Sequence, residues 1–202
     1  MDAEEYVGSL HNLGLSSYFY KDGVFHMVNA EHSYMLIDAD PVNEFDLKKV
    51  VEKKYDMQEL SFGIPVLDNA KTHVDLSEGD MKWIATKEIF EKFPRFIFVK
   101  KEDDSFIGFI PREDSDYEES QLKRRNITGN DAISCYDSKL LGLIMRFLLK
   151  CGESNVSVSF NNEYPLSMTT NRFSVLLAPQ MDSALPKSFV VEDDLLSYEY
   201  DE

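Results

Sequence analysis

The chain has 202 residues, which fits one large domain or two small ones and is enough to bury a hydrophobic core. Hydrophobic residues make up 43% of it and aromatic residues 12%, so we expect a folded globular protein. The formal net charge of −16 argues against nucleic acid as a partner unless the basic residues gather on one surface.

Cysteine content and apolar segments bear on the location of the protein. Cys135 and Cys151 do not make a disulfide framework, and we expect both to be reduced packing residues of an intracellular protein. The acidic N-terminal sequence MDAEEYVGSLHN lacks the apolar stretch of a signal peptide. Leu140–Leu149 is too short to span a bilayer, so no membrane partner is expected. The expected location is nuclear in a eukaryote, and cytoplasmic in a prokaryote or in a virus of such a host.

The first part of the chain predicts a helix followed by strands. Residues 2–13 carry apolar side chains at helical spacing. Lys21-Asp22-Gly23 is a hairpin signal, because glycine readily takes the positive φ that a tight turn needs. Residues 55–69 show no clear period and predict a linker. Strands are predicted over 17–20, 24–28 and 34–39, and a second helix over 45–54.

The second part repeats the order of a helix followed by strands. A helix is predicted over 81–93, where Pro94 ends it. The strongest helical pattern covers 138–150, and Gly152 suits a left-handed C-cap. Strands are predicted over 95–99, 106–110, 116–122, 131–135, 156–160, 166–169 and 173–177. The acidic segment 181–202 is expected to be loosely ordered.

Basic residues concentrate on three of the predicted helices, 45–54, 81–93 and 138–150. Together these helices carry ten of the 21 basic residues but only four of the 37 acidic ones. This sorting predicts one positive and one negative face, and a positive face holds a phosphate backbone without reading base sequence. The alternative is that the lysines only solvate helix surfaces. The first helix breaks the pattern, because it carries acids and no Lys or Arg.

Motifs of catalysis or metal binding are not found. The sequence has no P-loop, no G-x-S-x-G and no H-E-x-x-H motif. His26 and His32 flank a predicted turn, where a metal site is the less favoured interpretation. The acidic run Glu102-Asp103-Asp104 is better explained as a solvated hairpin than as carboxylate ligands. We therefore expect neither an enzyme nor a cofactor.

Several motifs resemble those of DNA sliding clamps of the proliferating cell nuclear antigen type. Residues 22–45, DGVFHMVNAEHSYMLIDADPVNEF, resemble the first-domain signature of the family. Tyr136-Asp137-Ser138-Lys139 resembles its "Y-L-S-K" helix start, and residues 156–166, VSVSFNNEYPL, a strand-turn-strand ending in "x-P-L/M". Residues 173–180, FSVLLAPQ, resemble its "L-x-x-x-L-A-P-K/R" ending, and Phe62-Gly63-Ile64-Pro65 its interdomain connector.

The resemblance implies an α+β protein with the sliding-clamp fold, with antiparallel sheets outside and helices inside. It divides the chain into a shortened first domain (1–54), a connector (55–71), a complete second domain (72–180) and an acidic tail (181–202). The missing part of the first domain includes the strand that pairs with the neighbouring subunit in the family, so closure of a homo-oligomeric ring, a trimer if closed, is in question.

The resemblance also implies a function and two sets of site residues. The chain would be a processivity factor that tethers a polymerase or other DNA-processing enzymes to duplex DNA, independently of sequence. The expected DNA contacts are Lys48, Lys49, Lys53, Lys54, Lys82, Lys87, Lys139, Arg146 and Lys150. The expected pocket for clamp-interacting peptides consists of Ser33, Phe62, Ile64, Pro65, Pro165, Leu176, Ala178 and Pro179.

Three alternatives stay open at this point. The first is a truncated clamp that never forms a ring and binds clamp-interacting peptides as a regulator or decoy. The second is an unrelated acidic α+β enzyme, which needs a convergent polar pocket. A third concerns the tail, whose Leu195, Leu196, Tyr198 and Tyr200 would fold back and occupy the peptide pocket.

Overall fold

The computed structural model describes residues 2–31, 33–41, 49–50, 57–61, 70–102, 104–111 and 120–180. Its helices are α1 (Ala3–Asn12), α3 (Glu78–Ile84), α4 (Lys87–Lys92) and α5 (Ser138–Lys150). Its strands are β1 (Leu15–Lys21), β2 (Val24–Asn29), β3 (Tyr34–Asp38), β4 (Gln58–Glu59), β5 (Thr72–Ser77), β6 (Arg95–Lys101), β7 (Asp104–Ile110), β8 (Gln121–Arg124), β9 (Thr128–Gly129), β10 (Ala132–Asp137), β11 (Asn155–Phe160), β12 (Leu166–Thr169) and β13 (Phe173–Leu177).

The strands form two sheets. The large sheet has nine strands in the order β4-β1-β2-β3-β13-β12-β11-β5-β9, and the small sheet has four in the order β10-β6-β7-β8. All neighbouring pairs are antiparallel except β1 and β4, which pair in parallel over two residues. The predicted antiparallel architecture is therefore confirmed, with one short exception inside the predicted linker.

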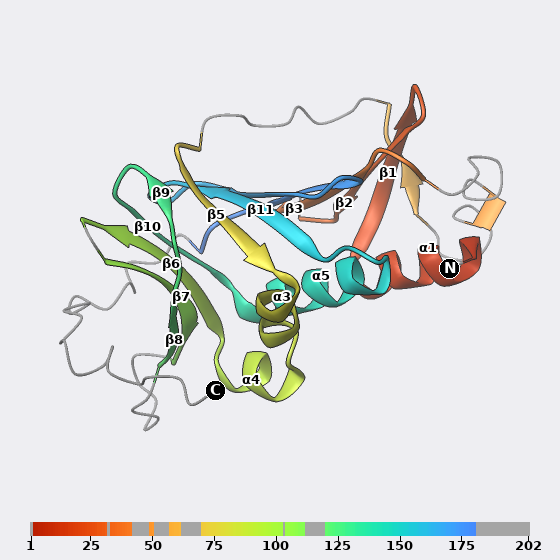
Figure 1. Cartoon of the computed structure of the whole chain (residues 1–202). Helices are drawn as coiled ribbons and strands as arrows, with labels where there is room; N and C mark the ends of the chain where they lie inside the picture. Colours follow the sequence, from red (N-terminus) through yellow and green to blue (C-terminus); the bar gives the residue numbers. More distant parts are fainter. Residues whose placement is uncertain are drawn as a thin grey trace.

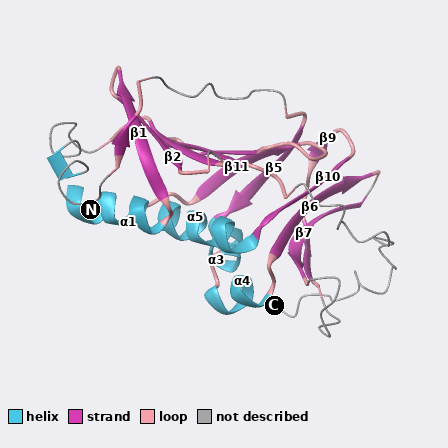
Figure 2. Cartoon of the chain, turned by 180° about the vertical axis from the view of Figure 1, so that it is seen from behind, coloured by secondary structure: helices cyan, strands magenta, loops and turns pink. Residues whose placement is uncertain are grey.

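The helices lie together on one side of the large sheet (Figures 1 and 2). α5 packs against α3 and α4, and the main hydrophobic core lies between these helices and the inner faces of both sheets. Gly142 permits this packing, because a Cβ there would stand 2.3 Å from the ring of Phe90 on α4. None of the described helices is long and apolar enough to cross a bilayer.

The helix predicted over 81–93 is in fact two helices, α3 and α4. α3 begins earlier than predicted, because Ser77 and Asp80 form a capping box at its N-terminus. It ends at Ile84, and Thr86 starts α4, where the amide of Phe90 donates to the Thr86 carbonyl at 3.1 Å. A turn at Ala85 and Thr86, where the amide of Thr86 donates to the Trp83 carbonyl at 3.1 Å, thus divides an apolar pattern that looks continuous in the sequence.

Most other predicted elements are confirmed with small shifts. α5 has the predicted bounds: Asp137 caps its N-terminus and Gly152 follows it with φ of 90°. The hairpin between β1 and β2 turns at Asp22 and Gly23, both with positive φ. The strand predicted over 116–122 appears as β8 at 121–124, and residues 112–119 lie outside the described ranges. Of the helix predicted over 45–54, only residues 49 and 50 are described, and both are helical.

Among the described strands, one pair joins the N-terminal elements to the rest of the chain. β3 pairs with β13 from Tyr34↔Leu177 to Asp38↔Phe173. At one end of this junction Arg172 binds both carboxylate oxygens of the buried Asp38, at 2.8 and 2.7 Å. The hydroxyl of Tyr6 on α1 donates to the same carboxylate at 2.5 Å. α1, β3 and the start of β13 are therefore fixed to one another by a buried charge and its partners.

Candidate functional site

The helix layer carries the described part of the predicted DNA-contact set. Lys139, Arg146 and Lys150 lie on α5, and all three are exposed. Lys82 and Lys87 lie on α3 and α4, and Lys49 is exposed in its helical turn. Lys48, Lys53 and Lys54 lie outside the described residues. The fold therefore brings cations from three different helices to one layer.

Several of these cations already have acidic partners on the same layer. Lys82 pairs with Glu78 at 2.6 Å and Lys87 with Glu91 at 3.6 Å, each one helical turn apart. Lys150 reaches across to Glu5 of α1 at 2.8 Å. Such exposed pairs each contribute only about 0.5 kcal/mol, so a phosphate group is able to compete for the cation.

Arg146 is held differently from the lysines. Its Nε donates to the carbonyl of Ala85, at the end of α3, over 2.7 Å. Its guanidinium stands 5.0 Å from the centre of the Phe90 ring, within range of a cation–π contact. These contacts fix the direction of the side chain, and they leave its charge without an acidic partner among the contacts that the structure describes.

The described helices differ from one another in charge. Together they carry six basic and six acidic side chains; two of the acids lie on α1, and two, Glu78 and Asp80, lie on the part of α3 before the predicted helix. α5 alone is basic without an acid. Among the described helices, an excess of basic over acidic side chains is therefore found on α5 alone.

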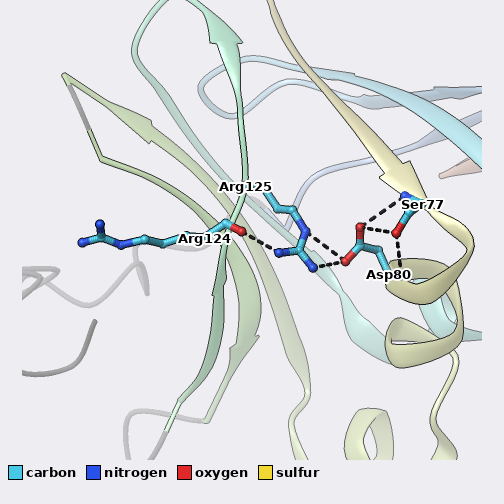
Figure 3. A network of polar contacts seen from close by, with 4 residues as sticks. All are labelled: Ser77, Asp80, Arg124 and Arg125. Carbon is cyan, nitrogen blue, oxygen red and sulfur yellow. Dashed lines mark hydrogen bonds and ion pairs between the residues drawn. The ribbon is translucent and has the colours of Figure 1, made fainter. Parts of the chain in front are cut away.

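A buried carboxylate links α3 to the segment that follows β8. Arg125 binds Asp80 through Nε at 2.9 Å and through a second contact from Nη2 (Figure 3). Burial alone would raise the pKa of Asp80, but hydrogen bonds from Arg125 and Ser77 outweigh it and hold the pKa below its usual value. An open, polar hollow lies nearby, lined by Asp104, Ser105, Arg124, Arg125 and Asn126. These polar contacts fix the position of the small sheet against the helices.

Part of the predicted peptide pocket comes together at the β3–β13 junction. The amide of Ala178 donates to the carbonyl of Ser33 at 2.8 Å, and Leu176 pairs with Met35. Pro165 directly precedes β12, whose first residue pairs with Leu177, so it lies at the same end of the sheet. Pro179 follows Ala178 and is partly exposed. Phe62, Ile64 and Pro65 lie outside the described residues.

The structure adds apolar residues to this site that the sequence prediction missed. Val28, Met35 and Ile37 form a separate buried cluster with Leu176 packed against it. The cluster lies on the face of the large sheet opposite the helices, since Tyr34 and Leu36, which alternate with its members, belong to the main core. A signal for these residues was present in the sequence. Positions 34–37 are all apolar, which predicts a strand that is covered on both faces.

The cysteine and histidine side chains of the described residues do not form a metal site. Burial raises the pKa of Cys151 to about 11, so its thiol is protonated at neutral pH. His26 stands on β2, and His32 lies outside the described residues. Within the described ranges, no three His, Cys, Asp or Glu side chains gather so that they could hold a metal ion.

No protein-family model and no curated protein sequence matches the chain. Solved structures do match it. A PCNA2–PCNA3 complex from Sulfolobus tokodaii gives a TM-score of 0.61 at 13% identity, over 90% of this chain and 98% of that one. PCNA of A. fulgidus, bound to the C-terminal region of FEN-1, gives 0.59 at 13% identity over 91% and 98%. The beta subunit of DNA polymerase III from Thermotoga maritima gives 0.58 at 12% identity over 89% and 64%.

The chain has the DNA sliding-clamp fold. Its first domain is short: residues 39–71 separate β3 from β5 and contribute β4 as their one described strand. From β5 to Leu177, the chain supplies all four strands of the small sheet and five strands of the large sheet. The small sheet ends at β8, which has a strand neighbour on one side only among the described residues.

Proposed function

We propose that this protein is a clamp-like tether without catalytic activity, which lies along duplex DNA and holds DNA-processing enzymes there through their clamp-interacting peptides. The sliding-clamp fold supports this class of function. A tether acts by raising the local concentration of its partner, so it needs two binding surfaces and no reactive group. The helix layer and the β3–β13 junction, on opposite faces of the large sheet, are the two surfaces.

The apolar cluster at the junction is the observation that carries the proposal. Val28, Met35, Ile37 and Leu176 form it beside the Ser33–Ala178 hydrogen bond. An apolar patch suits a peptide with aromatic anchors, because such anchors dominate the affinity of small interfaces. A connector that crosses the same patch would add backbone pairing to the peptide. A peptide of the type Q-x-x-hydrophobic-x-x-aromatic-aromatic is therefore the expected ligand.

Titration of a fluorescent peptide of this type tests the proposal directly. We expect saturable binding of the peptide to the wild type. Ala178→Asp should weaken the affinity for the peptide at least tenfold, which corresponds to about 1.4 kcal/mol of binding free energy. Thr169→Asp, an exposed change at the far end of β12, is the matched control and should bind as the wild type does. Failure of the wild type to bind the peptide would reject the peptide site.

A second candidate function is a regulator or decoy that binds the same peptides without encircling DNA. The short first domain favours it, since the strand that pairs with a neighbouring subunit in the family falls in the missing part. The acidic partners of Lys82, Lys87 and Lys150 favour it as well, because they weaken the attraction of the helix layer for phosphate. Peptide binding together with undetectable DNA binding would identify this function.

A further inference from the structure

The open hollow at the end of β7 and β8 is lined by polar residues. Asp104 and Ser105 begin β7, Arg124 ends β8, and Arg125 and Asn126 follow it. The volume of the hollow is about 310 Å³, at the lower end of the range of ligand sites, roughly 300–1,000 Å³. A ligand here has no apolar side chain of the lining to bury itself against. It must therefore be held by charge and hydrogen bonds.

Hydrogen bonds from Arg125 fix one wall of the hollow. Its amide donates to the carbonyl of Ser105 at 3.1 Å, and its Nη1 donates to the carbonyl of Arg124 at 2.6 Å. Its Nε donates to the buried Asp80 of α3 at 2.9 Å (Figure 3). Arg125 thus joins β7, β8 and α3. These bonds make it a positioning residue for the hollow rather than a contact for a ligand.

Arg124 is the cation that the hollow offers to a ligand. Its side chain extends away from Arg125 and Asp80 (Figure 3), and 63% of it is exposed. Its Nη2 lies 3.8 Å from Oδ1 of Asp104, which is too long for a hydrogen bond. An exposed ion pair of this length is weak, because water screens it. The guanidinium therefore keeps its planar set of N–H donors for an incoming acceptor.

Asp104 marks the place that an oxyanion takes beside Arg124. Its carboxylate is a negatively charged acceptor of the kind that a guanidinium binds, and the two groups face each other across the hollow. No hydrogen bond ties the Asp104 side chain to another described residue, and 48% of it is exposed. It is therefore able to turn into water when a stronger acceptor arrives. Until then, Asp104 competes for Arg124.

A phosphate group is such a stronger acceptor. It carries roughly 1.5 to 2 negative charges at pH 7, whereas a carboxylate carries one. A guanidinium binds it through two parallel N–H···O bonds. The hydroxyl of Ser105 and the side-chain amide of Asn126 are further donors in the lining. Because the lining includes no aromatic side chain, the remainder of a phosphate ester stays in water.

We propose that this hollow binds a phosphate group, with Arg124 as the main contact, Ser105 and Asn126 as hydrogen-bond donors, and Asp104 as a built-in competitor. The ligand is inorganic phosphate or a small phosphate monoester, which share the group that is recognised. The predicted acidic tail (181–202) lies outside the described residues and is no part of the site. The site belongs to other elements than α5 and the β3–β13 junction, so the inference does not depend on the proposed function.

Titration of the full chain with inorganic phosphate, followed by nuclear magnetic resonance at constant ionic strength, tests the proposal. The backbone amide signals of Ser105 and Asn126 should shift saturably. Arg124→Gln should weaken the affinity for phosphate at least tenfold, and its remaining amide signals should match the wild type, because the side chain is exposed. Lys21→Gln, which removes an exposed charge from the β1–β2 hairpin, is the matched control and should bind phosphate as the wild type does. Equal affinities of the wild type and Arg124→Gln would overturn the proposal.

Asp104→Asn tests the competitor. Asparagine keeps the size of the side chain and removes its charge, so the affinity for phosphate should rise at least threefold. Glu88→Gln, which removes an exposed acid from α4, gives the same change of net charge and should leave the affinity unchanged. Adding Arg124→Gln to Asp104→Asn should abolish the gain. A weaker affinity in Asp104→Asn would contradict the proposal, because Asp104 would then be a ligand rather than a competitor.

Comparison of inorganic phosphate with a nucleoside monophosphate separates the two sources of the phosphate group. We expect their affinities to agree within threefold and their shifts to centre on Ser105 and Asn126, because only the phosphate group is held. A nucleotide that binds more than tenfold tighter, and shifts amides outside the hollow, would contradict recognition of the phosphate group alone.

Discussion

At the scale of single residues, the buried carboxylate of Asp38 has the largest local consequence. It is fully buried, and its charge is met by two hydrogen bonds from Arg172 and one from Tyr6. Loss of one partner leaves a charge in a site without water, which is much more costly than loss of an exposed pair. The three residues lie far apart in the sequence, so this cost falls on the connection between the N-terminal elements and the rest of the clamp.

We expect Arg172→Ala to lower the free energy of unfolding by about 3–5 kcal/mol, because it leaves the buried Asp38 carboxylate without a positively charged partner. Arg124→Ala is the matched control: its side chain is exposed and lies 3.8 Å from Asp104, so its loss should change stability by less than about 1 kcal/mol. Urea unfolding followed by circular dichroism measures both. Equal stability of the two variants would contradict this account of the junction.

Asp80 makes stability depend on pH. Its pKa is lower in the folded chain than in the unfolded one, so the unfolded state binds more protons as the solution becomes acidic. The stabilisation is complete above the unfolded pKa, near 4, and is lost as pH falls through the folded pKa. The Tm of the wild type should therefore exceed that of Asp80→Asn at pH 6, and the difference should shrink toward pH 3. A difference that stays constant over this range would show that the Asp80 charge is not involved.

At the scale of elements, α5 is the part of the helix layer best suited to DNA. It carries three exposed cations and no acid, whereas α1 has no Lys or Arg and α3 and α4 together hold more acids than bases. Phosphate contacts of this kind position a protein on the duplex and carry no sequence information. All members of the predicted DNA-contact set, those on α5 included, stay predictions.

Reversal of Lys139, Arg146 and Lys150 to Glu should abolish measurable binding to duplex DNA at moderate salt. Each lost phosphate contact lowers the slope of log affinity against log salt by about 0.9, so single reversals should reduce the slope stepwise. Reversal of Lys21, Lys71 and Lys101, exposed residues away from the helices, gives the same change of net charge as a control. Fluorescence anisotropy with labelled duplex DNA measures the affinity of both sets of variants. An equal loss of affinity in both sets would show that net charge, and not the position of the α5 residues, causes the effect.

At the scale of the whole molecule, the edge strand β8 bears on self-association. It is paired with β7 on one side, and its sequence Gln121-Leu122-Lys123-Arg124 places two cations together on a four-residue edge. Short, charged edges resist pairing with a second copy of themselves. The resemblance of the sequence to the family predicts, in addition, that the strand which pairs with a neighbouring subunit falls in the missing part of the first domain.

We therefore expect a monomer of 23.3 kDa at micromolar concentration, measured by size-exclusion chromatography with light scattering. The high net negative charge acts in the same direction, because it opposes self-association at low salt. A mass three times larger, independent of salt, would instead point to a closed ring and would favour the encircling form of the tether over the regulator.

The sequence by itself determined the local elements of this clamp. Alternating apolar residues predicted most strands, while Asp137 and Gly152 marked the two ends of α5. Motifs in the sequence also located Ser33, Leu176 and Ala178, which the fold brings together at one junction. Each of these signals lies within a few residues of what it predicts, so a linear pattern contains it.

Only the tertiary structure decided which distant groups meet. Lys150 and Glu5 pair across two helices, Arg172 neutralises Asp38 across a strand pair, and Gln180 reaches β10 on the other sheet. Charge counted along single helices does not reveal such pairs between distant elements. Periodicity reports which side of an element is apolar but not which element covers it, because that choice depends on how the chain closes in space.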